Sequence, residues 1–169
     1  QTIRPLFDFF CPKLSMEVEF QTFDHTKSEV IYEDKSLEVI TIPLHHRVPC
    51  AGFLFKEKPN PRHLNKQQCD KYNIPIAYYQ AITMGRDWEL EDGTIITNSE
   101  LTTEPTPSKS YAYCSDTIYA ESIVPIIKGC DLVYHEATYM HDKVDTARER
   151  GHSTALQAGK IARLAEAKK

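Results

Sequence analysis

One carboxylate and two imidazoles follow or precede segments with the patterns of strands or helices, and hydrolytic metal sites use these residue types. Asp116 comes just after the apolar segment Tyr111–Cys114, His135 closes a second apolar segment, and His152 precedes a long Ala-rich segment. A carboxylate has two free oxygens and can bridge two cations about 3.5 to 4 Å apart. A nearby histidine that is not a ligand can hand a proton to a leaving group. The pattern therefore indicates a metal-dependent hydrolase.

Asp116 and a second carboxylate, Glu136, also have common structural interpretations. Asp116 could cap a helix that begins at Ile118, a role that the same carboxylate can combine with metal binding. Glu136, next to His135, could orient an imidazole, accept a proton or simply be an exposed loop carboxylate. The residues alone leave these alternatives open.

His152 directly precedes Ser153 and Thr154, two residue types that cap helices. A helix that starts here would leave backbone amides free for a phosphate, so that a proton donor would stand beside an anion site. The alternative is that His152 has no role beyond the start of this helix.

His45 and His46 lie in a corner between two segments with strand patterns, and sandwich hydrolases hold metal ligands in such corners. Adjacent residues of an extended segment point to opposite faces, so only one of the two imidazoles can reach a given site.

Strand patterns dominate the first part of the chain and alternate with helix patterns in the last part. A short helix is expected over Thr2–Phe10, ended by Pro12. An antiparallel meander followed by alternating strands and helices predicts an α/β (α+β) fold. The expected strands are Met16–Phe23, Glu29–Tyr32, Leu37–Ile42, Gly52–Lys56, Tyr111–Cys114 and Leu132–Tyr134. The expected later helices are Ile118–Ile127 and a long helix from Ser153.

Residues 57–97 form a more polar excursion from the predicted sheet, in which cationic side chains alternate with Tyr and Trp. Asn65 is expected to cap a helix through Tyr72, and a second helix is expected from Ile76 to Met84, ended by Gly85. The cations considered for RNA binding are Lys56, Lys58, Arg62, Lys66 and Lys71. Such clusters are usually solvated surfaces, so charge alone assigns them no role.

Composition limits the class of protein. A chain of 169 residues with 41% hydrophobic content is long enough for one domain with a core. The formal net charge of −4 argues against a protein that coats nucleic acid by bulk charge, so any nucleic-acid contact must be local. The five cysteines are scattered, without Cys-x-x-Cys spacing, so a reducing cytoplasm is the expected setting. No stretch approaches the roughly 20 apolar residues of a membrane span, so a soluble protein without a membrane partner is expected.

Four motifs, taken in order, resemble ribonuclease Z, the zinc-dependent endonuclease of the metallo-β-lactamase fold that trims the 3′ ends of precursor tRNA. They are Pro43–Phe53, Ser115-Asp116-Thr117, His135-Glu136-Ala137-Thr138 and Gly151-His152-Ser153-Thr154. The resemblance implies that residues 1–169 form an incomplete metallo-β-lactamase-like αββα sandwich. It further implies that the basic excursion 57–97 is a tRNA-binding arm and that the parent protein is a cytoplasmic homodimer.

The resemblance also assigns roles to single residues. It implies that His46, rather than His45, is a metal ligand and that Asp116 bridges two zinc ions. It implies that His152 contacts the scissile phosphate and protonates the departing ribose oxygen, and it adds His135 and Glu136 to the catalytic residues. Many members carry a Gly-Pro pair after an Ile-Pro in the arm, and the segment 74–79 lacks it.

Two ligand motifs of ribonuclease Z are missing from this sequence. One is His-x-His-x-Asp-His, and the other is a last ligand His, expected in a strand beyond Lys169. The chain begins without Met and its final helix has no clear cap, so both ends are expected to be cuts within a longer protein. With so few ligands, the chain alone is expected to be inactive. Two alternatives remain: a noncatalytic nucleic-acid or partner-binding module of the same fold, and a small-molecule phosphodiesterase or arylsulfatase of the metallo-β-lactamase superfamily.

Overall fold

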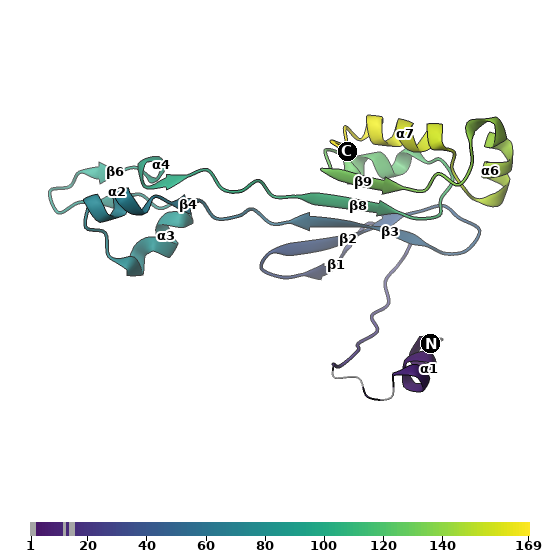
Figure 1. The fold of residues 1–169 in the computed structure, drawn as a ribbon, viewed down its shortest axis with the longest axis horizontal. Coiled ribbons are helices and arrows are strands. Elements are labelled where there is room, and N and C mark those ends of the chain that lie inside the picture. Colours follow the sequence, from purple (N-terminus) through teal and green to yellow (C-terminus); the bar gives the residue numbers. More distant parts are fainter. Residues whose placement is uncertain (1–2, 12, 14–15) are drawn as a thin grey trace.

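A computed structural model describes residues 3–11, 13 and 16–169, and its main body is one five-stranded sheet (Figure 1). The strand order is β1-β2-β3-β8-β9, with β9 parallel to β8 and all other neighbours antiparallel. The strands are β1 (Val30–Glu33), β2 (Leu37–Pro43), β3 (Ala51–Glu57), β8 (Ser110–Cys114) and β9 (Leu132–His135). Apart from the strand expected over Met16–Phe23, the predicted meander and the later strand–helix–strand unit are therefore confirmed.

Helices cover one face of this sheet. Ile42, Leu54 and Ala112 are buried there against Ile127 and Ile161 of the helical layer. The helical elements of this layer are η2 (Glu121–Ile123), α5 (Val124–Ile127) and α7 (Ala155–Leu164). The main body is therefore one sheet layer and one helix layer, a mixed α/β arrangement as expected.

The opposite face of the sheet is open and aromatic. Tyr113 and Tyr134 are 37% and 48% exposed, and their rings stack with centroids 5.0 Å apart. Phe55 and Tyr111 stack in the same way at 6.0 Å. Successive side chains of a strand point to opposite faces, so one alternation places aliphatic residues under the helices and aromatic residues on the open face.

Between β3 and β8 the chain leaves the sheet and returns (Figure 1). We call the two connecting segments, residues 58–62 and 104–109, the stalk, and residues 63–103 the head. The head has a core of its own, in which Cys69, Ile82 and Leu101 are fully buried. Its elements are β4 (His63–Leu64), α2 (Lys66–Lys71), η1 (Ile76–Tyr78), α3 (Tyr79–Thr83), β5 (Trp88–Glu89), β6 (Ile95–Ile96), α4 (Asn98–Leu101) and β7 (Thr102–Thr103). The excursion therefore continues to residue 109, beyond the expected limit of 97.

Local signals within the head are confirmed. The Asn65 side chain accepts a hydrogen bond from the Gln68 amide and caps α2. The helix expected from Ile76 to Met84 forms as η1 followed by α3, and Gly85 follows with a φ of 105°. Glycine adopts this backbone region without the strain that a Cβ atom would cause.

The predicted strand Met16–Phe23 is wrong. These residues pair with no strand of the described chain, and the Phe23 ring instead packs edge-on against Phe53 at 5.8 Å. Polar–apolar alternation indicates an extended segment with one packed side, but it does not show whether a neighbouring strand is present to pair with that segment.

The predicted helix Ile118–Ile127 is too long, because helical structure begins only at Glu121. The Ile118 amide donates to the His45 carbonyl at 2.8 Å, which holds this part of the chain in a loop. Pro125 lacks an N–H and fits only the first turn of a helix, so the α-helical turn has to start next to it. Asp116 therefore does not cap this helix.

Three further helices lie outside the two layers. α1 (Ile3–Phe10) matches the expected N-terminal helix, of which Thr2 and Pro12 lie outside the described residues, and it has no buried side chain. η3 (His141–Lys143) and α6 (Val144–Arg150) precede α7 and have no clear signal in the sequence. None of the described helices is long and apolar enough to cross a membrane.

Candidate metal centre

The carboxyl ends of the two parallel strands bring the candidate residues together. Cys114 at the end of β8 faces His135 at the end of β9, so Asp116 and Glu136 leave the sheet at the same edge. The loop between β2 and β3 brings His46 to this edge, because the Ile118 amide bonds the carbonyl of the neighbouring His45. Ligands collect at the carboxyl ends of parallel strands in α/β proteins, and this sheet follows that rule.

Three side chains offer ligand atoms within 4.8 Å of one another: His46, Asp116 and His152. His46 Nε2 is buried and has no hydrogen-bond partner within the described chain, whereas the Asp116 carboxylate is exposed. An orphaned imidazole nitrogen beside a free carboxylate suits a zinc ion, which takes nitrogen and oxygen ligands. Three donors fit one cation with an open position, and two complete zinc sites need more protein ligands.

Glu136 is the buried charge of the site, with 5% of its surface exposed. Its carboxylate accepts bonds from the backbone amides of Thr117, Thr138 and Ser153, each at 3.0 Å, and from the Thr138 hydroxyl at 2.9 Å. Burial alone would raise the pKa of Glu136, but these donors outweigh it and lower the pKa. Glu136 is therefore an ionised structural centre and not the exposed loop carboxylate considered from the sequence.

His152 connects the buried Glu136 carboxylate to His46 and Asp116, the other two members of the possible metal site. Its Nδ1 lies 2.9 Å from Glu136 Oε1, and its ring lies edge-on to His46 with centroids 5.1 Å apart. A carboxylate beside one ring nitrogen favours a proton on that nitrogen and fixes the ring orientation. His152 is the proton donor considered from the sequence. The structure places its imidazole within 4.8 Å of the ligand atoms of His46 and Asp116, the two expected metal ligands.

His135 lies outside the group of three. Its Nδ1 is 2.7 Å from the carbonyl of Glu136, and its Nε2 is buried without a partner among the described residues. Among the described residues, the His135 imidazole therefore bonds the Glu136 carbonyl and does not belong to the group of possible ligands formed by His46, Asp116 and His152.

Several of the backbone amides that were expected from the sequence to be free for an anion at the start of α7 are bonded within the chain. Thr154 is the N-cap and forms a capping box, in which its hydroxyl accepts from the Gln157 amide while the Gln157 side chain bonds the Thr154 amide. The Ser153 amide is bonded to Glu136, and the Ala155 amide donates to the Tyr139 carbonyl. These four amides already have partners within the chain and are not free for a phosphate in this structure.

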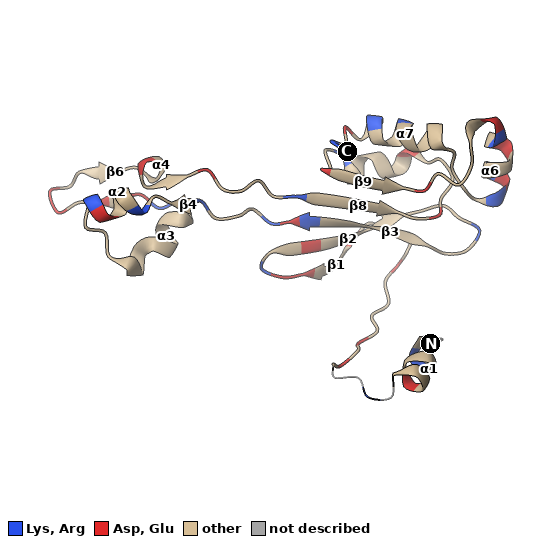
Figure 2. Ribbon diagram, viewed as in Figure 1, with Lys and Arg blue, Asp and Glu red and all other residues tan. Residues whose placement is uncertain are grey.

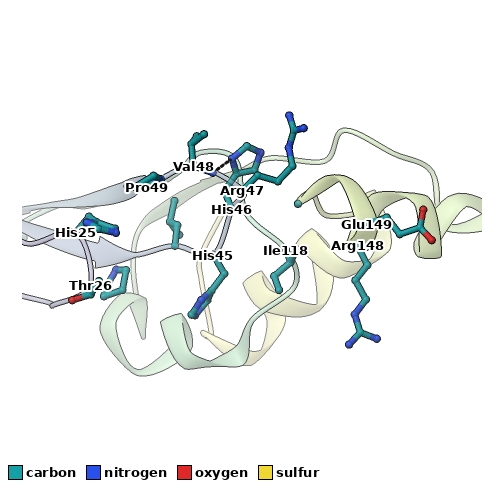
Figure 3. A pocket seen from close by; sticks show the side chains of 13 residues that line it. His25, Thr26, His45, His46, Arg47, Val48, Pro49, Ile118, Arg148 and Glu149 are labelled. Carbon is teal, nitrogen blue, oxygen red and sulfur yellow. Dashed lines mark hydrogen bonds between the residues drawn. The ribbon is translucent and has the colours of Figure 1, made fainter.

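A cavity of about 600 Å³ opens beside His46 (Figure 3). The side chains of His45 and His46 point in different directions, as adjacent residues of an extended segment should, and only His46 belongs to the ligand group. The cavity is also lined by His25, Arg47, Arg148 and Glu149, among others. Sequence reasoning assigns these four residues no role. For His25, Arg148 and Glu149 the reason is that the loop before β1 and helix α6 give no sign in the sequence that they reach the β2–β3 loop.

The five cations considered for RNA binding are spread from the sheet to the head. Within the described chain, four of them are paired with carboxylates: Lys56 with Glu38 at 3.2 Å, Lys58 with Glu33 at 2.7 Å, Arg62 with Glu104 at 2.8 Å and Lys71 with Glu100 at 4.0 Å. Residues 57–97 contain five Lys and Arg against six Asp and Glu, so the excursion as a whole is not basic. Figure 2 shows both signs of charge along the stalk and head. Any RNA contact must therefore use single cations, such as Lys66 at the start of α2.

The chain matches proteins named Ribonuclease Z along almost its whole length. It is 49% identical over 167 residues to the Ribonuclease Z of Porphyromonas gingivalis. This match covers 99% of this chain and 55% of that relative. It is 48% identical over 166 residues to the Ribonuclease Z of Phocaeicola vulgatus. This match covers 98% of this chain and 54% of that relative. The chain spans about half the length of the curated relatives that it matches. No protein-family model matches the chain.

Two solved structures align with most of the chain. Human tRNase Z, short form (ELAC1), gives a TM-score of 0.48 at 20% identity, covering 86% of this chain and 38% of that chain. The metallo-β-lactamase fold protein YhfI from Bacillus subtilis gives a TM-score of 0.46 at 17% identity, covering 86% and 38%.

Proposed function

We propose that this chain, which is homologous to ribonuclease Z over 99% of its length, forms part of an endoribonuclease that removes the 3′ trailer of precursor tRNA. The observation that carries the proposal is the convergence of His46, Asp116 and His152 within 4.8 Å, with Glu136 buried behind His152. These residues come from the four motifs on which the sequence resemblance rests.

His46 and Asp116 are the residues that would hold the metal ions, which we take to be zinc. Bound zinc supplies an activated water and neutralises charge at the phosphate. Glu136 would accept the Nδ1 proton of His152, so in the doubly protonated imidazolium form it is the Nε2 proton that would pass to the departing ribose oxygen. His135 supports this arrangement through its bond to the Glu136 carbonyl.

We further propose that the remaining ligands come from residues that the relatives have outside the matched half. The same residues would supply a second sheet against the open aromatic face, which would complete a metallo-β-lactamase-like αββα sandwich. A sheet with apolar side chains on both faces is typical of one that is covered on both sides. The resemblance also supports a homodimer, and the five free cysteines suit a cytoplasmic setting.

The test uses a hybrid in which this chain replaces the matching half of the P. gingivalis Ribonuclease Z, because that relative supplies the outside residues. In this hybrid, Asp116→Ala should abolish cleavage of precursor tRNA and reduce the zinc content. His152→Ala should abolish cleavage with zinc retained. His45→Ala is the matched control, since this neighbouring imidazole lies outside the ligand group, and it should keep both properties.

Two outcomes would count against the proposal. If the unmutated hybrid folds and binds zinc but cleaves no precursor tRNA, the endoribonuclease function fails. If zinc is lost with His152→Ala and retained with Asp116→Ala, the assignment of ligand and acid is reversed.

The five cations considered for RNA binding can be tested by salt dependence. Each phosphate contact changes the logarithm of affinity by about 0.7 to 0.9 per logarithmic unit of salt. Lys66→Ala should therefore raise the apparent KM for precursor tRNA and flatten its salt dependence, while Lys56→Ala, Lys58→Ala, Arg62→Ala and Lys71→Ala, whose cations already face carboxylates, should do so less. Equal losses on a small chromogenic phosphodiester would show that these residues support the fold or the metal site and do not bind RNA.

A further inference from the structure

Tyr139 places an aromatic ring beside His152 without belonging to the metal-ligand group. The centroids of the two rings are 6.1 Å apart, and their planes are inclined at 55°. On the Nδ1 side of the same imidazole lies the Glu136 carboxylate, at 2.9 Å. The imidazole of the proposed acid therefore has a carboxylate at one ring nitrogen and a tyrosine ring as a neighbour.

The backbone holds Tyr139 at this place. The Tyr139 amide donates to the Ser153 carbonyl at 3.3 Å, and the Ala155 amide donates to the Tyr139 carbonyl at 2.9 Å. These two bonds form an isolated parallel bridge between Tyr139 and Thr154. Residues paired across a bridge point to the same side, as do residues two apart in an extended segment, so Tyr139 and His152 share a side. Backbone pairing therefore sets the position of the ring, and a ligand is not needed to bring it there.

The Tyr139 side chain is not required by a hydrophobic core. Neither of the two clusters of buried apolar residues in the described chain includes it, and the side chain is only partly buried. Its hydroxyl has no hydrogen-bond partner among the described residues, whereas the hydroxyls of Tyr72 and Tyr119 bond Glu100 and Glu121. The ring and its hydroxyl are therefore available to a ligand that reaches His152.

The chemistry of the proton donor shows which part of an RNA would come near this ring. A general acid acts within hydrogen-bond distance of the oxygen that it protonates, so Nε2 of His152 would lie about 3 Å from the departing ribose oxygen. The base attached to that ribose would then lie beside the residues that flank His152. Proteins commonly stack unpaired RNA bases on the rings of Phe, Tyr, Trp or His.

We propose that Tyr139 is a substrate-contacting residue whose ring stacks on the base of the nucleotide that carries the departing oxygen. The proposal rests on the proposed function, because that reaction brings a ribose to His152. The stacked base would hold the ribose against Nε2, and it would do so for all four bases, since every base has a π-face. The opposing view is that Tyr139 only packs against His152 and steadies its ring. In that case loss of the Tyr139 ring would harm the cleavage of every substrate alike.

Precursor tRNAs with a single abasic nucleotide decide between the two views. One substrate lacks the base on the ribose that carries the departing oxygen, and a second lacks the base of the nucleotide across the scissile phosphate. In the hybrid enzyme, Tyr139→Ala should lower kcat/KM for the intact substrate about tenfold, in keeping with the loss of one base–aromatic stack. The second substrate should show the same loss. The first substrate, whose stacking base is already missing, should show almost none.

Two further variants separate the ring from its surroundings. Tyr139→Phe retains the ring and should cleave the intact substrate at the rate of the unmutated hybrid. Met140→Ala is the matched control, because this neighbouring side chain is 70% exposed and adjacent residues of an extended segment point to opposite sides. It should leave kcat/KM unchanged for all three substrates. Each comparison between substrates is made within one variant, so a change in zinc content does not alter the ratio.

Four outcomes would overturn the stacking role while the endoribonuclease function stands. They are equal losses with Tyr139→Ala on all three substrates, no loss on the intact substrate, insensitivity of the second substrate instead of the first, and a loss with Tyr139→Phe as large as that with Tyr139→Ala. The last outcome would mean that the hydroxyl, and not the ring, makes the contact. An unmutated hybrid that folds and binds zinc but cleaves no precursor tRNA would overturn both the stacking role and the proposed function.

Discussion

Glu136 shows how a single buried carboxylate organises three loops of the site. Its oxygens bind the amides of Thr117 after β8, Thr138 after β9 and Ser153 before α7. An ionised group can remain buried when several donors compensate for its lost hydration. The same oxygens hold His152, so the position of the proposed acid depends on this network.

Replacing Glu136 with Gln should lower the free energy of unfolding by about 1 to 3 kcal/mol, because the amide group offers one acceptor oxygen and turns two donors toward existing donors. Urea denaturation of the chain would measure the change. Glu91→Gln, an exposed carboxylate at the far end of the head, is the control and should change little. Equal stability of the two variants would mean that the network does not hold the loops.

At this scale the sequence is informative about residue types and less so about their partners. The four motifs are enough to select His46, Asp116, Glu136 and His152, which the structure brings close together. That the Ser153 amide binds Glu136 instead of a phosphate could not be read from spacing, since the contact joins residues 17 positions apart. His25 and Arg148 line the cavity only because the fold brings their segments to it, and no local sequence pattern indicates this.

At the scale of elements, the predictions were right where residues close together in the sequence determine the local structure. Strong apolar strands and the Asn65 cap follow from periodicity and from one side-chain bond. Met16–Phe23 failed because pairing is a nonlocal property, and Ile118–Ile127 failed because loop contacts to His45 and Glu136 overrode the helical pattern.

Gly151 links the end of α6 to the metal-ligand group. Its φ is 85°, and a Cβ atom here would lie 2.8 Å from Cδ2 of His46. Gly129 has a similar φ of 74°, but a Cβ atom there would meet nothing within 4 Å. The two glycines therefore share the backbone requirement and differ in the contact with His46.

Gly129→Ala and Gly151→Ala should each cost roughly 1 to 2 kcal/mol in unfolding free energy, because alanine is strained at positive φ. Only Gly151→Ala should also displace the His46 ring and lower the zinc content of the hybrid enzyme, measured by atomic absorption. If both variants kept full zinc content, the His46 ring would have room to move without leaving the site, and the proposed link between α6 and the metal would be wrong.

At the scale of the whole molecule, the open sheet face and the small ligand set both fit the proposal that residues outside the matched half complete the domain. Tyr113, Tyr134 and Leu132 expose large apolar surfaces beside the edge where His46 and Asp116 lie. Patches of this kind mark surfaces that other protein normally covers. A second layer that covers the aromatic face would end near the same edge, where it could add the ligands that two zinc sites need.

Zinc stoichiometry tests this explanation directly. Catalytic zinc sites use about three protein ligands each. Of the three donors that the described chain brings together, only His46 and Asp116 are proposed as ligands, beside the proposed acid His152, and Asp116 is exposed to competing water. Equilibrium dialysis of the chain should therefore find weak or substoichiometric zinc, and the hybrid with the P. gingivalis half should hold two ions per chain. The Asp116→Ala chain is the control for adventitious binding to surface histidines and cysteines, and its residual zinc is subtracted. Two tightly held ions on the chain alone would require ligands beyond these three residues, and the site would have to be assigned anew.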